Sequence, residues 1–201
     1  MKMYKKVMAA ALAGVMTVSM SATAFAADDD GYILKATNED SKSSDNDLVI
    51  AIEGSVSSMD PANIPDTNAI SATRGVYETL VSFDENQELT GKLAESWEVS
   101  DDSLTYTFKL RQGVKFQDGT DFNAAAVKAN YDRVVNKDNN LRQRRTFIVT
   151  NEDGSETPRV DSIETPDDYT LVIKLTQAWA PFINRLTQFC IISPAALEEY
   201  G

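Results

Sequence analysis

Few side chains in this sequence could perform catalytic chemistry. The 201 residues include no histidine and a single cysteine, Cys190. Without an imidazole there is no Ser/His or Cys/His pair to activate a nucleophile, and one thiol excludes a Cys₂ or Cys₄ metal site within this chain. The sequence also lacks GxGxxG and GxxxxGK[ST], the glycine-rich loops that bind phosphates. We therefore expect neither enzymatic activity nor a cofactor.

Carboxylates are the most abundant reactive groups, since 31 acidic residues outnumber 19 basic ones and give a formal net charge of −12. A glycosidase-type pair needs two carboxylates placed in one cleft, which spacing alone does not predict. The run Asp28-Asp29-Asp30 lacks the ligand spacing and turn glycine of a calcium loop, so we expect no metal site. The negative charge argues against nucleic acid as a partner.

The stretch of residues 93–134 organises the remaining chain, because three structural signals follow one another in it. Apolar and polar residues alternate over residues 104–110, which predicts a half-buried strand. A short strand at 114–116 and a turn at Gln117-Asp118-Gly119-Thr120 come next. Asn123 then caps a predicted helix, one face of which carries Val127, Tyr131 and Val134.

The residue identities in this stretch carry a resemblance. In order they read Leu-Ala-Glu-Ser-Trp, Thr-Tyr-Thr-Phe-Lys-Leu-Arg, Gly-Val-Lys-Phe, Asp-Gly-Thr and Asn-Ala-x-x-Val. This series resembles the N-terminal part of extracytoplasmic solute-binding proteins of the peptide/nickel class, the receptors of ATP-binding-cassette (ABC) importers. The likeness extends more weakly over residues 48–201. It implies an α/β fold: a type II periplasmic-binding-protein-like lobe with an inserted mixed α+β subdomain, and the second lobe missing.

The N-terminal residues have the pattern of an export signal. Lysines precede a short apolar run at residues 7–18, and Ala24-Phe25-Ala26 is an A-x-A cleavage site, so we expect residues 1–26 to be a cleaved signal peptide. No cysteine lies near this site, so we expect no lipid anchor. We predict an exported protein, periplasmic or extracellular, whose mature chain does not insert into the membrane.

The mature chain divides into three expected parts. Residues 27–47 are rich in Asp, Ser, Asn and Lys and predict a disordered acidic leader. The resemblance assigns residues 48–76 and 181–201 to the first lobe and residues 77–180 to the inserted subdomain. In the N-terminal half we expect a buried strand at 48–52 and a helix that is capped by Asp66 or Thr67 and continues to Val81. Further on we expect a hairpin of 160–164 and 169–175, a helix at 181–186 and a strand at 189–192. A last helix should be capped by Ser193.

The resemblance also supplies candidate ligand contacts. A loop at the position of Ile64, Pro65, Asp66 and Thr67 contacts the ligand in peptide receptors, although it could instead only cap a helix. Arg142-Gln143-Arg144 followed by Phe147 resembles a motif of nickel receptors in which the aromatic side chain faces the ligand. Alternatively, Phe147 could be an aromatic residue of the core. The place of Gln188 resembles that of a polar residue that contacts the ligand in peptide receptors. We expect Cys190, Trp97 and Trp179 to be packing residues, and residues 142–145 to be solvated or to contact local acids.

By resemblance, the function is that of the substrate-binding component of an ABC importer. It would capture oligopeptides or dipeptides outside the cytoplasmic membrane and deliver them to the permease subunits. The alternatives are a receptor of the same class for nickel or another small solute, or a remnant or interaction module with no transport function. The sequence offers no arginine between Gln188 and Pro194 and no Tyr or Met at 63–71, where nickel receptors use such residues, so we favour the peptide.

Overall fold

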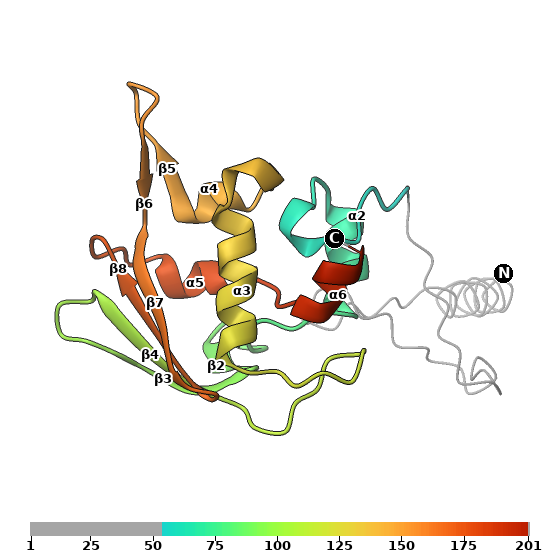
Figure 1. The fold of residues 1–201 in the computed structure, drawn as a ribbon, viewed down its shortest axis with the longest axis horizontal. Helices are drawn as coiled ribbons and strands as arrows, with labels where there is room; N and C mark the ends of the chain where they lie inside the picture. Colours follow the sequence, from blue (N-terminus) through green and yellow to red (C-terminus); the bar gives the residue numbers. More distant parts are fainter. Residues whose placement is uncertain (1–53, 201) are drawn as a thin grey trace, which may run out of the picture. The chain divides into compact units, whose positions relative to one another are not determined.

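The computed structural model describes residues 54–200 (Figure 1). The predicted signal peptide, the acidic leader and the strand at 48–52 lie outside these residues. The described part belongs to one compact unit. Its elements are, in order, η2 (Pro61–Asn63), α2 (Thr67–Arg74), β1 (Val81–Phe83), β2 (Leu89–Gly91), β3 (Ala94–Val99), β4 (Thr105–Leu110), α3 (Ala124–Val135), η3 (Lys137–Asn139), α4 (Arg144–Phe147), β5 (Ile148–Thr150), β6 (Glu156–Pro158), β7 (Val160–Asp167), β8 (Thr170–Leu175), α5 (Phe182–Leu186) and α6 (Pro194–Tyr200).

An antiparallel sheet with strand order β3-β4-β8-β7 forms the largest layer. The predicted alternation in β4 is confirmed, since Tyr106, Phe108 and Leu110 are buried while the residues between them are partly or fully exposed. The sheet presents this apolar face to α3 and α5, which lie on the same side of it in Figure 1. Period-2 patterning therefore places one face of the sheet in the core.

The predicted hairpin of β7 and β8 is confirmed, but its turn is shifted. We expected the turn at residues 165–168, whereas β7 continues to Asp167 and β8 begins at Thr170. The register shifts between Glu164 and Asp167, which accommodates Pro166. A proline is tolerated there because β7 is an edge strand, and its missing N–H breaks no bond with a further strand.

Helix α3 begins and runs as predicted. Asn123 Oδ1 accepts a hydrogen bond from the Ala126 N–H at 2.9 Å, which satisfies one free donor of the first turn. Val127 and Val134 are buried, and the Tyr131 ring packs edge-to-face on Phe147 with centroids 5.3 Å apart. Burial raises the pKa of Tyr131 to about 12.

The helix predicted to run to Val81 is wrong beyond its second turn. α2 ends at Arg74 with Gly75 as its C-cap, and the Tyr77 N–H donates to Thr73 O at 2.9 Å. Glycine and the β-branched Val76 disfavour a further helical turn. The chain then turns into the β1–β2 hairpin. The predicted strands at 114–116 and 189–192 are each reduced to one bridge, Lys115 to Asp121 and Cys190 to Thr79.

One hydrophobic core joins the sheet to segments at both ends of the described chain. Phe108 and Leu171 from the sheet share it with Leu80 and with Phe182 and Phe189 near the C-terminus. Trp97 and Trp179 pack against this core, and Cys190 is partly buried, in agreement with the packing roles that we predicted. None of the helices within residues 54–200 has the length and apolar character needed to cross a membrane.

Candidate ligand-binding site

The loop of Ile64, Pro65, Asp66 and Thr67 is a capped connection with exposed positions. Asp66 caps α2 by accepting from the Ala69 N–H at 2.9 Å, and it also accepts from Ser57 Oγ at 2.5 Å. These two hydrogen bonds, the Ser57 bond first, lower the pKa of Asp66. Pro65 and Thr67 are exposed and Ile64 is half-buried. The capping role is therefore present, and the exposed positions on either side of Asp66 are available to a ligand.

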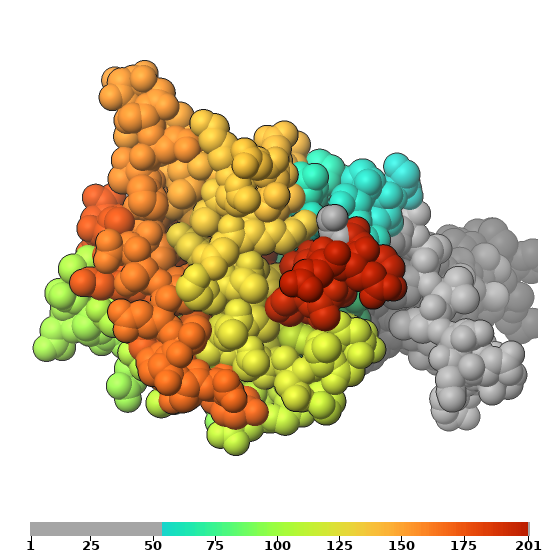
Figure 2. All heavy atoms as spheres, in the orientation of Figure 1, coloured from blue at the N-terminus to red at the C-terminus, as the bar shows by residue number. Residues whose placement is uncertain are grey.

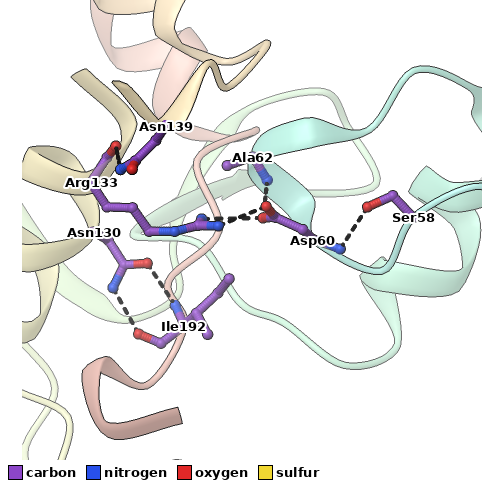
Figure 3. A network of polar contacts seen from close by, with 7 residues as sticks. All are labelled: Ser58, Asp60, Ala62, Asn130, Arg133, Asn139 and Ile192. Atoms are coloured by element: carbon purple, nitrogen blue, oxygen red, sulfur yellow. Dashed lines mark hydrogen bonds and ion pairs between the residues drawn. The ribbon is translucent and has the colours of Figure 1, made fainter. Parts of the chain in front are cut away.

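The segment just before this loop is held to α3 by an ion pair (Figure 3). Arg133 Nη2 lies 2.7 Å from Asp60 Oδ2, and Nη1 donates to Oδ1 at 3.2 Å. Asp60 also caps η2 by accepting from the Ala62 N–H at 3.0 Å. Both side chains are largely shielded, with 20% of Arg133 and 28% of Asp60 exposed. A two-point guanidinium–carboxylate contact fixes orientation as well as distance.

A second anchor on α3 holds the segment before α6. Asn130, which is 3% exposed, donates from Nδ2 to Ile192 O at 2.7 Å and accepts from the Ile192 N–H at 3.0 Å (Figure 3). The Asn130 side-chain amide thus pairs with both the N–H and the C=O of Ile192, as a residue of a neighbouring β-strand would. The same Nδ2 donates to Ala126 O at 2.9 Å. One turn of α3 therefore holds both the 58–62 and the 189–193 segments.

The turn before α3 makes a third connection. Asp118 accepts a short hydrogen bond from Ser193 Oγ, and Thr120 also bonds Asp118 at 2.6 Å. These bonds, the Ser193 bond first, lower the pKa of Asp118. Ser193 Oγ also accepts from the Ala196 N–H at 3.3 Å, which confirms the predicted cap of α6. The space-filling view shows α6 against α3 and this turn (Figure 2).

Gln143 hydrogen-bonds both Gln188 and a residue just before the loop of Ile64 to Thr67. Its N–H donates to Ala62 O at 3.0 Å, and its Nε2 donates to Gln188 O at 2.7 Å. Ala62 lies two residues before Ile64, and the Gln188 side chain is exposed. Two segments far apart in the sequence are therefore adjacent at Gln143.

Phe147 does not face solvent. Its ring is 1% exposed and packs edge-to-face on Tyr131 and on Phe189, each with centroids 5.3 Å apart. Of the two roles that we considered, the structure places Phe147 in the core, beneath the segment that carries Gln143. The neighbouring Arg144 contacts a local acid as expected, although the acid is Glu156, at 2.7 Å, and not one of those closest in sequence. Arg144 lowers the pKa of Glu156.

Sequence reasoning missed the residues that assemble these segments: Asp60, Asp118, Asn130, Arg133 and Gln143. A signal existed for Asn130, since it lies between Val127 and Val134 on the buried face of α3, where an amide needs polar partners. The other partners are too far apart in sequence to be read from local patterns. Within residues 54–200, no group of three His, Cys, Asp or Glu side chains is arranged to hold a metal ion.

The fold is that of a lobe of a type II periplasmic binding protein, and solved structures share it. The chain resembles the binding protein DppA of Helicobacter pylori in complex with peptide STSA, with TM-score 0.56, 30% identity and coverage of 71% of this chain and 30% of that one. It also resembles NikA of Brucella suis in complex with Fe(III)-EDTA, with TM-score 0.57, 34% identity and coverage of 70% and 26%.

The family follows from the sequence comparisons. Residues 88–200 match the profile of bacterial extracellular solute-binding proteins, family 5 (middle region). The glutathione-binding protein GsiB of Escherichia coli (strain K12) is 38% identical over 190 residues, which is 94% of this chain and 32% of that protein. The chain therefore belongs to family 5 of the bacterial extracellular solute-binding proteins, and the resemblance to the N-terminal part of a peptide/nickel-class receptor is confirmed. It spans about a third of the length of the curated relatives that it matches.

Proposed function

We propose that this protein is the substrate-binding component of an ABC importer, and that it captures short peptides outside the cytoplasmic membrane and delivers them to the permease. The observation that carries this proposal is the 38% identity over 190 residues with a glutathione-binding protein, because glutathione is a tripeptide. The DppA structure with a bound peptide adds support. In this role the protein binds and releases its ligand and does no chemistry on it.

We propose that the peptide contacts Ile64, Pro65, Asp66 and Thr67 on one side and Gln188 on the other. The backbone is extended at Ile64 (φ −76°, ψ 123°) and at Asp66 (φ −141°, ψ 162°), a conformation that can pair with a peptide main chain as an added strand does. The exposed Gln188 amide offers both a donor and an acceptor. Because Phe147 lies in the core, we propose that it does not contact the ligand and that it contributes by packing under the residues around Gln143.

We also propose that the protein is exported from the cytoplasm. Residues 1–26 act as a cleaved signal peptide and residues 27–47 as a leader, so the mature protein works in the periplasm or outside the cell. Residues 48–76 and 181–201 form the first lobe and residues 77–180 the inserted subdomain. In the whole receptor, closure of two lobes over the peptide by hinge motion would create the form that the permease binds.

A second candidate is a receptor for a metal chelate. The observation that favours it is the 34% identity with NikA of Brucella suis, whose structure holds Fe(III)-EDTA. The two candidates differ in ligand chemistry, since a peptide offers main-chain amides and a chelate offers carboxylates around a metal.

Isothermal titration calorimetry of the purified protein tests both candidates. The probes are reduced glutathione, trialanine, and the nickel complex of free histidine. We expect saturable one-to-one binding of at least one peptide probe. Binding of the nickel complex with no heat from either peptide would favour the second candidate, and no binding of any probe would contradict the proposed function.

A further inference from the structure

Gln143 makes two hydrogen bonds of different kinds to two different segments. The first uses its main chain, whose N–H donates to Ala62 O at 3.0 Å. The second uses its side chain, whose Nε2 donates to Gln188 O at 2.7 Å across 45 residues of sequence. A single residue before α4 therefore hydrogen-bonds both η2, at Ala62, and the segment just after α5, at Gln188.

The Gln188 main chain takes part in one further hydrogen bond besides that from Gln143 in the described residues. Its N–H donates to Arg185 O at 3.2 Å, a bond within the same short segment. In the part of the chain that the structure describes, Gln143 is the side chain that hydrogen-bonds Gln188. The next residue, Phe189, is buried in the core, Cys190 bridges to Thr79 and the Ile191 N–H donates to Glu78 O at 3.0 Å. Gln143 therefore adds a side-chain hydrogen bond to a segment that packing and main-chain contacts also hold.

We propose that Gln143 is a positioning residue for ligand binding: it sets the separation between the loop of Ile64 to Thr67 and the exposed amide of Gln188. This inference rests on the proposed function, in which one peptide contacts both segments. Pre-organised contacts raise affinity because less freedom is lost on binding. Loss of the Gln143 side chain should therefore weaken peptide binding more than it weakens the fold.

The chain offers a matched control in Gln117. Its Nε2 also donates to a main-chain carbonyl, Val76 O, at 2.8 Å, across 41 residues of sequence and at an exposed position. That bond lies beyond the C-terminal end of α2, whereas the loop of Ile64 to Thr67 precedes α2. Removal of either amide deletes one long-range hydrogen bond of similar geometry, but of the two only the Gln143 amide bonds a proposed ligand contact, Gln188.

The test compares Gln143→Ala, Gln143→Glu and Gln117→Ala in the whole protein. Gln143→Glu keeps the size of the side chain and removes its N–H donors. Each variant is measured for its melting temperature, for reduced-glutathione and trialanine affinity by calorimetry, and for peptide-level hydrogen exchange without ligand. We expect both Gln143 variants to lose about five- to tenfold in affinity, the effect of one hydrogen bond, and to exchange faster over residues 186–190. Gln117→Ala should keep the wild-type affinity and exchange faster only near residue 76.

Several results would overturn the inference. Unchanged exchange over residues 186–190 would show that Gln143 does not position Gln188. Wild-type affinity in both Gln143 variants, or an equal loss in Gln117→Ala, would show that ligand binding does not depend on this bond in particular. A wild-type protein that binds no peptide contradicts the proposed function itself, and the exchange measurement then still decides whether Gln143 holds Gln188.

Discussion

Asp60 and Arg133 form a two-point ion pair that joins the segment before α2 to the last turn of α3, across 73 residues of sequence. The same helix holds Ile192 through Asn130. α3 belongs to the part that we assign to the inserted subdomain, and both segments that it holds belong to the part that we assign to the first lobe. The two parts are therefore connected by oriented polar contacts in addition to a shared core.

Arg133→Ala should destabilise the protein by about 1–3 kcal/mol, because it removes two charge-assisted hydrogen bonds from a shielded site. The measurement is urea unfolding followed by circular dichroism. Lys128→Ala is the control on the same helix: its pair with Asp132 is exposed (42% and 54%) and should contribute about 0.3–0.5 kcal/mol. Equal losses in the two variants would contradict a special role for the Asp60 pair.

Asn130→Ala should destabilise more than removal of an exposed amide. It leaves the N–H and C=O of the partly buried Ile192 without the Asn130 amide as partner, and an unsatisfied group costs up to about 1–3 kcal/mol when it is buried. Asn139→Ala serves as the comparison, since Asn139 is exposed and donates one bond to Arg133 O at 2.8 Å. If both variants unfold at the same urea concentration, the Asn130 contact with Ile192 does not stabilise the fold.

Cys190 should react slowly while the protein is folded. Burial raises the pKa of its thiol to about 11, against an opposing effect of the Arg74 charge, and the thiolate is the reactive form. Labelling by iodoacetamide at pH 8 should be about 100-fold slower than in urea, and Cys190 is the only thiol that can react. Equal rates in the folded and unfolded states would contradict the burial.

The same pKa shift predicts how stability changes with pH. A thiol whose pKa is raised by folding is deprotonated first in the unfolded state. Its contribution to stability is therefore complete below the unfolded pKa of about 8.5 and is lost as the pH rises toward 11. Cys190→Ser should lose less stability than wild type between pH 8 and pH 10. A parallel decline in the two proteins would show that the thiol does not contribute.

Gly91→Ala should lower the melting temperature, because it disturbs the connection between β2 and β3. A Cβ at Gly91 would lie 2.3 Å from Ala94 O and 3.2 Å from Glu95 O, both main-chain atoms, so β2 or β3 would have to move. Gly113→Ala is the control, since its Cβ would meet nothing within 4 Å and only its φ of +72° is unfavourable, at a cost of about 1 kcal/mol. A larger drop in melting temperature for Gly113→Ala than for Gly91→Ala would contradict the close approach.

The sequence predicted those features whose causes are local. The alternation of Tyr106, Phe108 and Leu110 gives the buried face of β4, and Asn123 gives the start of α3, because period and capping are properties of neighbouring residues. The prediction that α2 continues to Val81 is wrong because Gly75 ends the helix, while the apolar residues further on, such as Leu80, are buried by tertiary packing and not on a helical face.

The candidate site could be predicted only in part, because its geometry depends on distant pairs. The loop before α2 and Gln188 were proposed through family resemblance, but the hydrogen bonds of Gln143 to Ala62 and Gln188 join residues far apart in sequence and could not be read from local patterns. Phe147 shows the opposite case: an aromatic that fits a ligand-facing motif is a core residue here, since Tyr131 and Phe189 enclose it.

Hydrogen exchange with and without reduced glutathione or trialanine tests the central claim most directly. If one of these peptides binds where we propose, it should slow exchange in the segments covering residues 64–69 and 186–190, while β4 and β8 keep their rates. Calorimetric binding with protection of those two segments is the predicted result. Binding with protection elsewhere in the chain and none at these segments would contradict the proposed site.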